Sequence, residues 1–390
     1  MQLNLVIERI VRGKIYPALA RWQAEPYTPA WRQFEQHWPN TVPLRLQEYF
    51  ENHGIDYSVY GIDESYPANS FYPIGLGFFN FDIDYFALLP VPVFSALLSQ
   101  KLRLLFYYHE GDNPRHIKAR LDQLVTLHNL SPNCYRFISG NTAAASLPNF
   151  AYFPDFELWY RHRNKMPALP IHNRPRLKDF TVLNRLHKSW RATFMTDLLP
   201  LLGNSYWSYC ETGKIFDEEN PLEIDSVAGL RQRTQQFLDY APYFADELSD
   251  SERNNNAITV NQFFTDAWMH IVVETHWDAD QSNGAFLTEK TFKPIKHGQP
   301  FFIAGCAGSL QTLRDLGYRT FDSVLDNNYD NIQDNTQRWR ALRRSIEQVQ
   351  DRLPQVFEQC RPDIEHNQQL FLEQKTQRLN TLLERLYEQN

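Results

Sequence analysis

One segment limits the fold of this chain more than any other: an apolar strand followed by an amphipathic helix and a second strand. Residues 102–110 read LRLLFYYHE, a nearly unbroken apolar run of strand length. Residues 113–130 then place their apolar side chains on one helical face, and residues 134–141 (CYRFISGN) form the next strand. A strand–helix–strand unit of this kind predicts buried parallel strands. The sequence therefore predicts an α/β fold.

The same pattern starts again after a proline-rich stretch. Residues 165–176 (KMPALPIHNRPR) contain three prolines and no apolar period, which is typical of a linker between domains. Further strands are expected at 179–185, 271–273 and 300–304, and further helices at 189–203, 289–297 and 309–317. We therefore expect two Rossmann-like domains facing a cleft, at residues 1–170 and 177–334, followed by C-terminal helices at 335–390.

The C-terminal tail carries one apolar stripe. From Trp339 to Cys360 the apolar residues alternate steps of three and four, which predicts helices with one buried face. Pro354 and Pro362 are expected to break the tail into separate helices that pack on the domains. The first hundred residues show only weak periodicity, so they predict no more than a mixed α and β structure.

Charge and cysteine content exclude several classes of protein. Thirty-nine Lys and Arg against 46 Asp and Glu give a formal charge of −7, without the basic stripe of a duplex nucleic-acid binder. The four cysteines lie far apart and form neither a disulfide framework nor a zinc-ligand spacing. The N-terminus lacks a signal-peptide pattern, and the longest nearly apolar run, 86–98, is too short for a bilayer. We expect a cytoplasmic protein with no membrane span and no nucleic-acid partner.

The sequence lacks the motifs of several enzyme classes. It has no P-loop, no G-x-S-x-G, no H-E-x-x-H and no G-x-G-x-x-G that opens a helix. Two Asp-x-Asp triplets, Asp82/Asp84 and Asp278/Asp280, could hold Mg²⁺ or Mn²⁺ against a diphosphate. Roughly one or two such triplets arise by chance in a chain of this composition, so no metal site is expected.

A cationic segment follows the strand at 179–185. In LNRLHKSWR, the side chains of Arg185, His187, Lys188 and Arg191 fall at the strand end and in the first turns of the next helix. Cations there oppose the helix dipole, whereas backbone N–H groups at a helix start favour a bound phosphate. The segment is either a phosphate site or a solvated helix end, and phosphate is the favoured interpretation.

A second polar segment surrounds the helix expected at 289–297, which Thr288 can cap and Gly298 ends. Near a diphosphate, Glu289 could accept both hydroxyls of a ribose, while Lys290 or Lys293 could neutralise the phosphates. A glycine-containing turn from Gly305 leads into the helix that starts at Ser309. Alternatively, Glu289 interacts only with the helix dipole and the glycines only turn the chain.

These segments together resemble a known enzyme family. T-E-K at 288–290, an apolar helix, a hydrophobic strand and a G-x-x-G turn resemble the donor-binding segment of nucleotide-sugar glycosyltransferases of the GT-B type. The resemblance is to the α-1,3-fucosyltransferase-like and exostosin-like families, and it covers residues 177–333. Those families carry an acidic residue on the strand before this segment, here Glu274, and a segment similar to LNRLHKSWR. Pro294 inside the helix departs from the family pattern.

The resemblance implies a glycosyltransferase that moves a sugar from a nucleotide-diphosphate sugar to an acceptor hydroxyl of a glycan or another molecule. The nucleotide sugar is then a co-substrate, and neither a further cofactor nor a metal is expected. The resemblance implies a donor-binding set of Arg185, Lys188, Arg191, Glu274, Glu289, Lys290, Lys293, Gly305 and Ser309.

The acceptor hydroxyl also needs a general base. Glu110 is the first candidate and His109 the second, because both follow the strand at 102–108, and α/β sheets place their sites at the carboxyl ends of strands. Alternatively, HEGDNP is only a polar turn with Asp112 as the helix N-cap. Two other functions stay open: a non-catalytic nucleotide- or glycan-binding protein, and a sugar transferase acting on nucleic acid.

Overall fold

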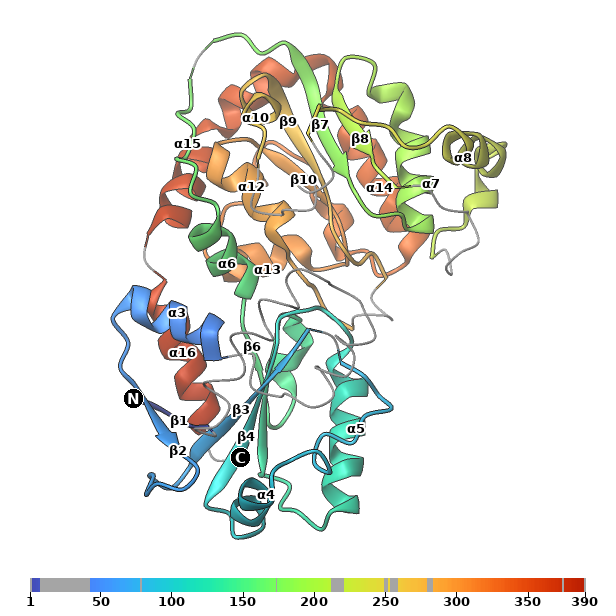
Figure 1. The fold of residues 1–390 in the computed structure, drawn as a ribbon. Helices are drawn as coiled ribbons and strands as arrows, with labels where there is room; N and C mark the ends of the chain where they lie inside the picture. The colour runs from blue at the N-terminus through green and yellow to red at the C-terminus, as the bar shows by residue number, and fades with distance from the viewer. Residues whose placement is uncertain are drawn as a thin grey trace. The chain divides into compact units, whose positions relative to one another are not determined.

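The protein is described here by a computed structural model (Figure 1). The structure describes residues 2–7, 43–77, 79–172, 174–211, 221–248, 252, 259–278, 283–373 and 375–388.

The chain divides into two compact units. The first unit comprises Met1–Asp155 and Gln374–Asn390, and the second comprises Phe156–Glu373. The predicted linker at 165–176 lies inside the second unit. The tail predicted as one group of C-terminal helices is divided between the units, because its last helix belongs to the first unit.

The first unit is built on one parallel sheet with the order β2-β1-β3-β4-β5-β6. Every neighbouring pair in this sheet is parallel. The chain places β2 on one side of β1 and all later strands on the other side, which is a doubly wound topology. The strands are β1 (Leu3–Ile7), β2 (Tyr57–Gly61), β3 (Ser70–Leu76), β4 (Leu102–Tyr108), β5 (Tyr135–Ser139) and β6 (Phe150–Tyr152).

Helices cover both faces of this sheet (Figure 1). Helices α4 (Val91–Leu98) and α5 (Pro114–Leu127) pack their buried side chains into one apolar core with β3, β4 and β5. Helices α3 (Pro43–His53) and α16 (Thr376–Tyr387) lie on the opposite side, where the ring of Tyr387 meets that of Phe71 edge-on at 5.3 Å. The strand–helix–strand unit predicted at 102–141 is confirmed.

The second unit repeats the same topology on a smaller sheet of order β10-β9-β7-β8, again with parallel pairs. Here β8 lies on one side of β7, and β9 and β10 lie on the other. The strands are β7 (Lys178–Asn184), β8 (Tyr206–Tyr209), β9 (Ala267–Val273) and β10 (Phe301–Ala304). The predicted fold class, α/β with two Rossmann-like sheets, is confirmed.

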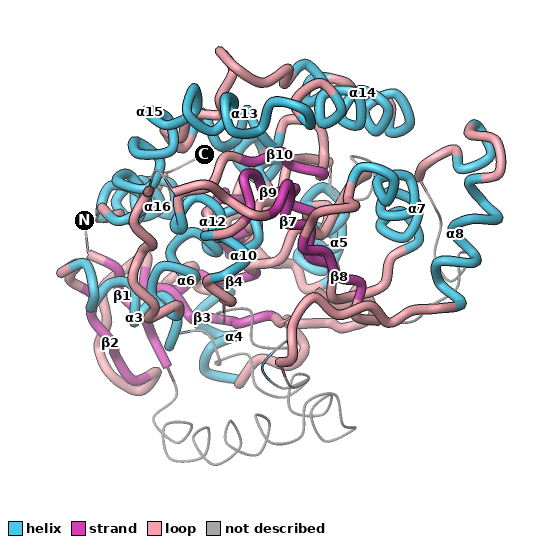
Figure 2. Tube along the Cα trace, turned by 90° about the horizontal axis from the view of Figure 1, so that it is seen from above, coloured by secondary structure: helices cyan, strands magenta, loops and turns pink. Residues whose placement is uncertain are grey.

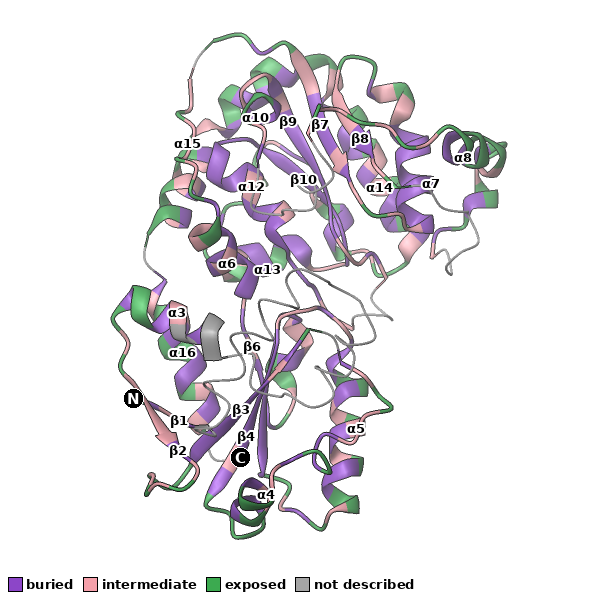
Figure 3. Cartoon of the chain, in the orientation of Figure 1, coloured by how far each residue is buried: buried purple, intermediate pink, exposed green. Residues whose placement is uncertain are grey.

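Helices surround this second sheet, and its strands are largely buried (Figures 1 and 3). They are α6 (Asp155–Arg163), α7 (Ser189–Leu198), α8 (Leu230–Asp239), α10 (Gln262–Thr265), α12 (Glu289–His297), α13 (Ser309–Asp315), α14 (Asn335–Glu347) and α15 (Leu353–Leu372). Figure 2 shows α14 and α15 beyond β10, the edge strand of this sheet. Helix α15 packs on α12, where the ring of Phe371 stacks on that of Phe292, whereas Arg343 of α14 pairs with Asp197 of α7. The helices predicted to start at residues 189, 289 and 309 are confirmed, and each starts at the predicted residue.

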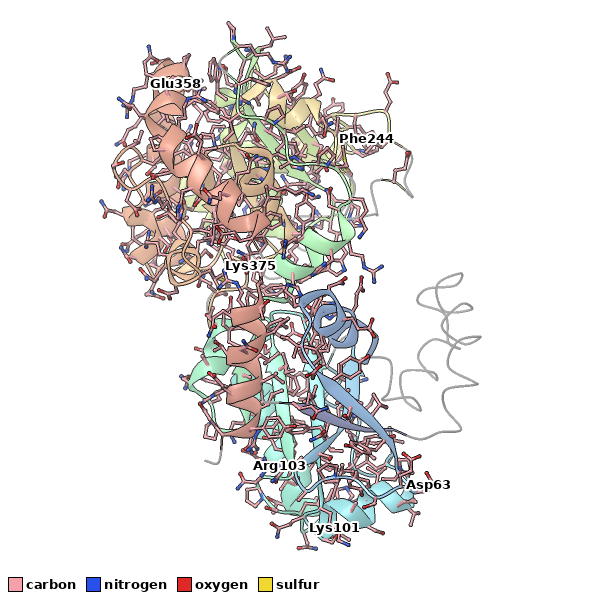
Figure 4. The ribbon with its side chains drawn as sticks, turned by 90° about the vertical axis from the view of Figure 1, so that its left-hand side faces the viewer. Asp63, Lys101, Arg103, Phe244, Glu358 and Lys375 are labelled. Atoms are coloured by element: carbon pink, nitrogen blue, oxygen red, sulfur yellow. The ribbon has the colours of Figure 1, made fainter. Side chains whose placement is uncertain are left out.

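The C-terminal helices confirm the apolar stripe but correct one predicted break. Every stripe residue from Trp339 to Cys360 is buried. Pro354 lies in the first turn of α15, as expected for a helix start, whereas Pro362 lies inside α15 without ending it. Pro362 removes the N–H that would bond the carbonyl of Glu358, and both residues are exposed, so water can serve that carbonyl. Figure 4 shows Glu358 on the outer surface of the helix.

Two further predictions can be compared with the structure. All four cysteines are free, which confirms that they form no disulfide framework. Among the residues that the structure describes, no helix is both long and apolar enough to cross a membrane.

Candidate active site

The topology of the second unit selects one position for a ligand. The chain leaves β7 toward β8 on one side and later returns to β9 on the other side, so β7 and β9 flank the point where the strand order reverses. In open parallel sheets, ligands bind outside the carboxyl ends of the strands at this point. The residues that follow Asn184 and Val273 are therefore the candidates for contact with a ligand.

Glu274, directly after β9, connects this edge of the sheet to the start of α12 through hydrogen bonds. Its carboxylate is completely buried and accepts four hydrogen bonds. Oε1 accepts from the Thr288 N–H (3.0 Å) and the Thr291 hydroxyl (2.6 Å). Oε2 accepts from the Thr288 hydroxyl (2.6 Å) and the Thr275 N–H (3.3 Å).

These bonds occupy the carboxylate of Glu274, because an ionised carboxylate has about four acceptor positions. The structure shows Glu274 holding the first turn of α12 against the end of β9. A direct contact between Glu274 and a sugar donor stays a prediction.

Helix α12 presents one carboxylate and two lysines beside this anchor. Thr288 is its N-cap, and the helix ends at Gly298 in the left-handed conformation (φ 70°), as the sequence predicts. Lys290 Nζ donates to the hydroxyls of Thr275 (3.0 Å) and Thr288 (3.1 Å) and lies 4.0 Å from Glu289 Oε1. The Glu289 residue itself is only 4% exposed.

Lys290 and Lys293 lie near Glu289 on α12 and form a cationic cluster with Arg185. Burial lowers the pKa of Lys293, the Glu289 carboxylate raises it, and the charges of Lys290 and Arg185 lower it again. Arg185 therefore lies within electrostatic range of Lys293, although it comes from the end of β7 and not from α12. Lys293 makes no hydrogen bond or ion pair with any residue in the described part of the chain. The structure thus brings together four of the predicted donor-binding residues.

Asn184, the last residue of β7, was not singled out by the sequence. Its side chain is buried, at 3% exposure, yet neither its amide oxygen nor its amide nitrogen has a hydrogen-bond partner among the described residues. A buried amide without partners costs about 1–3 kcal/mol for each unsatisfied group, so such side chains call for a ligand or an ordered water. No sequence pattern distinguishes this asparagine from one with its partners in place.

Lys188 ends the turn between β7 and α7, and Arg191 lies in the first turn of α7. The buried Arg191 guanidinium donates to the carbonyl oxygens of Leu186 (3.1 Å) and Glu274 (2.7 Å), so it ties this turn to the end of β9. Lys188 is the N-cap residue of α7, and its side chain is half-buried. Contacts of Arg191 and Lys188 with a diphosphate stay predictions.

The turn from Gly305 to Ser309 is closely packed. A Cβ at Gly305 would lie 3.1 Å from Ser309 Oγ and 3.4 Å from Glu274 Cβ, so only glycine fits without a shift. Ser309 Oγ donates to the Cys306 carbonyl (2.7 Å), and the Asp330 carboxylate accepts from the N–H groups of Leu310 and Gln311 (both 3.0 Å).

Asp330 therefore occupies the start of α13, where a phosphate would otherwise bind. The predicted donor contacts of Gly305 and Ser309 are not tested by this geometry and stay predictions.

In the first unit, His109 and Glu110 follow β4 directly. Their side chains lie 3.3 Å apart (His109 Nε2 to Glu110 Oε1) and remain partly exposed. The Asp112 carboxylate accepts from the Tyr108 hydroxyl, and Asn113, not Asp112, is the N-cap of α5. The alternative role of Asp112 as N-cap is therefore wrong, because Asn113 already accepts the Arg115 N–H at 3.0 Å.

The first Asp-x-Asp triplet takes part in local hydrogen bonds. Asp84 accepts from His128 (2.8 Å) and from the N–H groups at the start of the next turn. Asp280 lies outside the residues that the structure describes. Within the described ranges, no group of three His, Cys, Asp or Glu side chains could hold a metal ion.

No family model and no curated protein matches this sequence. Among solved structures, the chain is similar to a DNA-modifying β-glucosyltransferase that was determined with and without its substrate uridine diphosphoglucose. The two chains share 12% identity over 95% of this chain and 98% of that one, with a TM-score of 0.36. A likeness at this level decides neither fold nor function, so the fold described above rests on the two sheets themselves.

Proposed function

We propose that this chain is a glycosyltransferase that moves a sugar from a nucleotide-diphosphate sugar to an acceptor hydroxyl. One observation carries the proposal: Lys290 and Lys293 accompany Glu289 on α12, within electrostatic range of Arg185, at the strand-order reversal of a doubly wound sheet. These three basic side chains outnumber the Glu289 carboxylate, so the net charge of the four is positive at the place where such sheets bind ligands. The resemblance of residues 177–333 to nucleotide-sugar transferases agrees with this interpretation.

In the proposed reaction, the cation cluster binds the diphosphate and Glu289 accepts hydrogen bonds from the ribose hydroxyls. The acceptor oxygen forms a bond to the anomeric carbon while the bond from that carbon to the diphosphate oxygen breaks. Negative charge then grows on the departing nucleoside diphosphate, and fixed cations in a partly buried site stabilise it. Lys293 suits this role because its side chain makes no hydrogen bond or ion pair with the described residues.

The proton of the acceptor hydroxyl passes to a base, and we assign this role to Glu110. Its carboxylate is partly exposed and lies beside His109, so the imidazole can orient it or take its place as the base. Both residues follow the carboxyl end of β4, one strand away from the strand-order reversal between β1 and β3.

A non-catalytic nucleotide-binding protein would share the cation cluster but would transfer nothing. A panel of radiolabelled nucleotide sugars, each incubated with free sugars, a glycan mixture and duplex DNA, separates the two functions. We expect label to pass from one donor to a hydroxyl acceptor or to water, with release of the nucleoside diphosphate. Binding of a nucleoside diphosphate without any transfer or hydrolysis would instead support the binding protein. Transfer to the DNA would overturn the prediction that nucleic acid is not a partner.

A further inference from the structure

The first unit contains a hollow at the end of its sheet opposite to Glu110. It measures about 270 Å³ and lies at the amino-terminal ends of β4 and β5 and the loops beside them. We propose that this hollow binds the phosphate group of a small phosphorylated molecule. The side chains that line it and carry the argument are Asn69, Gln100, Arg103, Asn133 and Arg136.

Two arginines from neighbouring strands meet at this hollow. Leu105 of β4 pairs in register with Arg136 of β5, and Arg103 lies two residues before Leu105. Because side chains alternate between the faces of a strand, Arg103 and Arg136 point to the same face of the sheet. Figure 4 labels Arg103 and the neighbouring Lys101 at this end of the first unit.

Within the described ranges, no carboxylate forms an ion pair with either arginine. Arg136 is buried and donates to the carbonyl oxygens of Tyr135, Leu386 and Glu388 and to the amide oxygen of Asn149. Arg103 makes no hydrogen bond or ion pair with the residues described.

The pKa values of both arginines agree with an uncompensated cationic site. Burial, together with the charges of Arg103 and Arg385, lowers the pKa of Arg136 to about 10. Burial also lowers the pKa of Arg103. Both guanidinium groups remain charged at neutral pH, and none of the groups that shift their pKa values is an Asp or Glu side chain.

The other lining groups suit a phosphate as well. The side-chain amides of Asn69, Gln100 and Asn133 make no hydrogen bond within the described residues, so each can donate to an anion. The guanidinium fork matches the oxygen geometry of a phosphate, which also offers more charge than a carboxylate. At about 270 Å³ the hollow falls just below the volume range of ordinary ligand pockets. The site therefore fits a phosphate on a short carbon skeleton better than a nucleotide.

This hollow is separate from the proposed base. Strand β4 runs from Leu102 to Tyr108, and seven residues of strand span roughly 20 Å, so Glu110 lies at the far end of the same strand. The hollow is also linked to the last helix, because Arg136 holds the carbonyls of Leu386 (3.1 Å) and Glu388 (2.9 Å) at the end of α16. A ligand that contacts Arg136 would thus also stabilise α16 on the sheet.

Titration calorimetry of the full chain with inorganic phosphate and with glycerol 3-phosphate, at constant ionic strength, tests the proposal. We expect saturable binding that Arg103→Gln weakens at least tenfold, which corresponds to about 1.4 kcal/mol. Lys101→Gln removes an exposed lysine outside the lining and should change binding less than twofold. Lys293→Gln, at the candidate nucleotide site, should also leave this binding within twofold. Tighter binding of glycerol 3-phosphate would identify a phosphorylated metabolite, and equal binding would identify free phosphate as the ligand.

Three results would overturn the proposal. The first is the absence of saturable binding of either probe to the wild-type protein. The second is an equal loss of affinity in Arg103→Gln and Lys101→Gln, which would indicate diffuse surface charge. The third is a loss in Lys293→Gln with none in Arg103→Gln, which would place the anion at the other site. Because Arg103 makes no bond in the described structure, Arg103→Gln should keep the wild-type melting temperature.

Discussion

Replacing Asn184 with leucine should stabilise the ligand-free protein and weaken its binding of a nucleotide. The amide oxygen and nitrogen of Asn184 are buried, and neither has a partner among the described residues. Leucine is close in shape and has no polar atom to leave unsatisfied. If a bound nucleotide supplies the missing partners, the same substitution removes a contact that the ligand needs.

The size of the effect follows from the two unsatisfied groups. Each costs about 1–3 kcal/mol when buried without a partner, and leucine removes both costs. The strain of fitting the larger leucine side chain offsets part of this stabilisation. A net gain of about 1 kcal/mol raises the melting temperature by roughly 2–4 °C in a unit of this size. The assay is a thermal melt of the full chain with and without UDP or GDP, which should stabilise the wild type but much less the variant.

Asn164 provides a matched control. It lies in the same unit and is equally buried, at 3% exposure. Its side chain, however, donates to the hydroxyls of Tyr160 (2.8 Å) and Thr259 (2.9 Å) and accepts from Lys296 (3.1 Å). Asn164→Leu should therefore destabilise the protein, because it leaves those partners unsatisfied. A fall in melting temperature for Asn184→Leu as large as that for Asn164→Leu would show that the Asn184 amide is not unsatisfied in the ligand-free protein.

Three further predictions concern catalysis, metal and pH. Steady-state kinetics should show Glu110→Gln lowering kcat by about 10²–10⁴ with donor affinity nearly unchanged, and Glu289→Ala raising the donor KM more than it lowers kcat. Wild-type kcat in Glu110→Gln would show that the base is misassigned. EDTA should leave donor turnover within about twofold; loss of activity that Mn²⁺ restores and Asp82→Ala mimics would reveal a metal site. Burial lowers the pKa of Lys296 from 10.5 to about 8, so the unfolded chain binds more protons between these values and the free energy of unfolding should rise with pH there. Denaturant titrations should show this rise reduced in Lys296→Met, and an equal rise in both proteins would contradict the assignment.

The sequence was most informative where periodicity and capping residues agree. Thr288 and Gly298 bound α12 in both the prediction and the structure, because a threonine N-cap and a left-handed glycine are local signals. The buried strand β4 was equally clear, since a continuous apolar run bounded by turns is the pattern of a parallel strand.

The first hundred residues were not predictable in this way. Strand β3 reads SFYPIGL, with a proline and a glycine inside it, which argues against a central strand. Within the described residues, the pairing of β3 with β1 is at Phe71, so the missing N–H of Pro73 removes no ladder bond to the described part of β1. Such an arrangement depends on the pairing with a distant strand, and local sequence does not record it.

The sequence predicted which charged residues gather at the candidate site, but not which of them contact a ligand and which hold the fold. Arg185, Glu289, Lys290 and Lys293 were expected together, and the structure places them together. Glu274 was expected to touch the donor, but its carboxylate holds α12 through partners up to 17 residues away. The unsatisfied amide of Asn184 is a property of the packed structure, which no residue pattern encodes.

The central claim is that the cation cluster at the end of β7 and the start of α12 binds a nucleoside diphosphate. Titration calorimetry of UDP and GDP into the wild type, Lys293→Met and Lys178→Met tests it most directly. Lys178 lies at the opposite end of β7 and donates to Asn204 (3.2 Å), so it is a matched lysine outside the site.

We expect that one of the two nucleotides binds the wild type and that Lys293→Met weakens this binding at least tenfold, since a charge-assisted hydrogen bond contributes about 1.5–3 kcal/mol. Lys178→Met should stay within twofold of the wild type. Absence of binding by either nucleotide, or an equal loss in both variants, would contradict the claim.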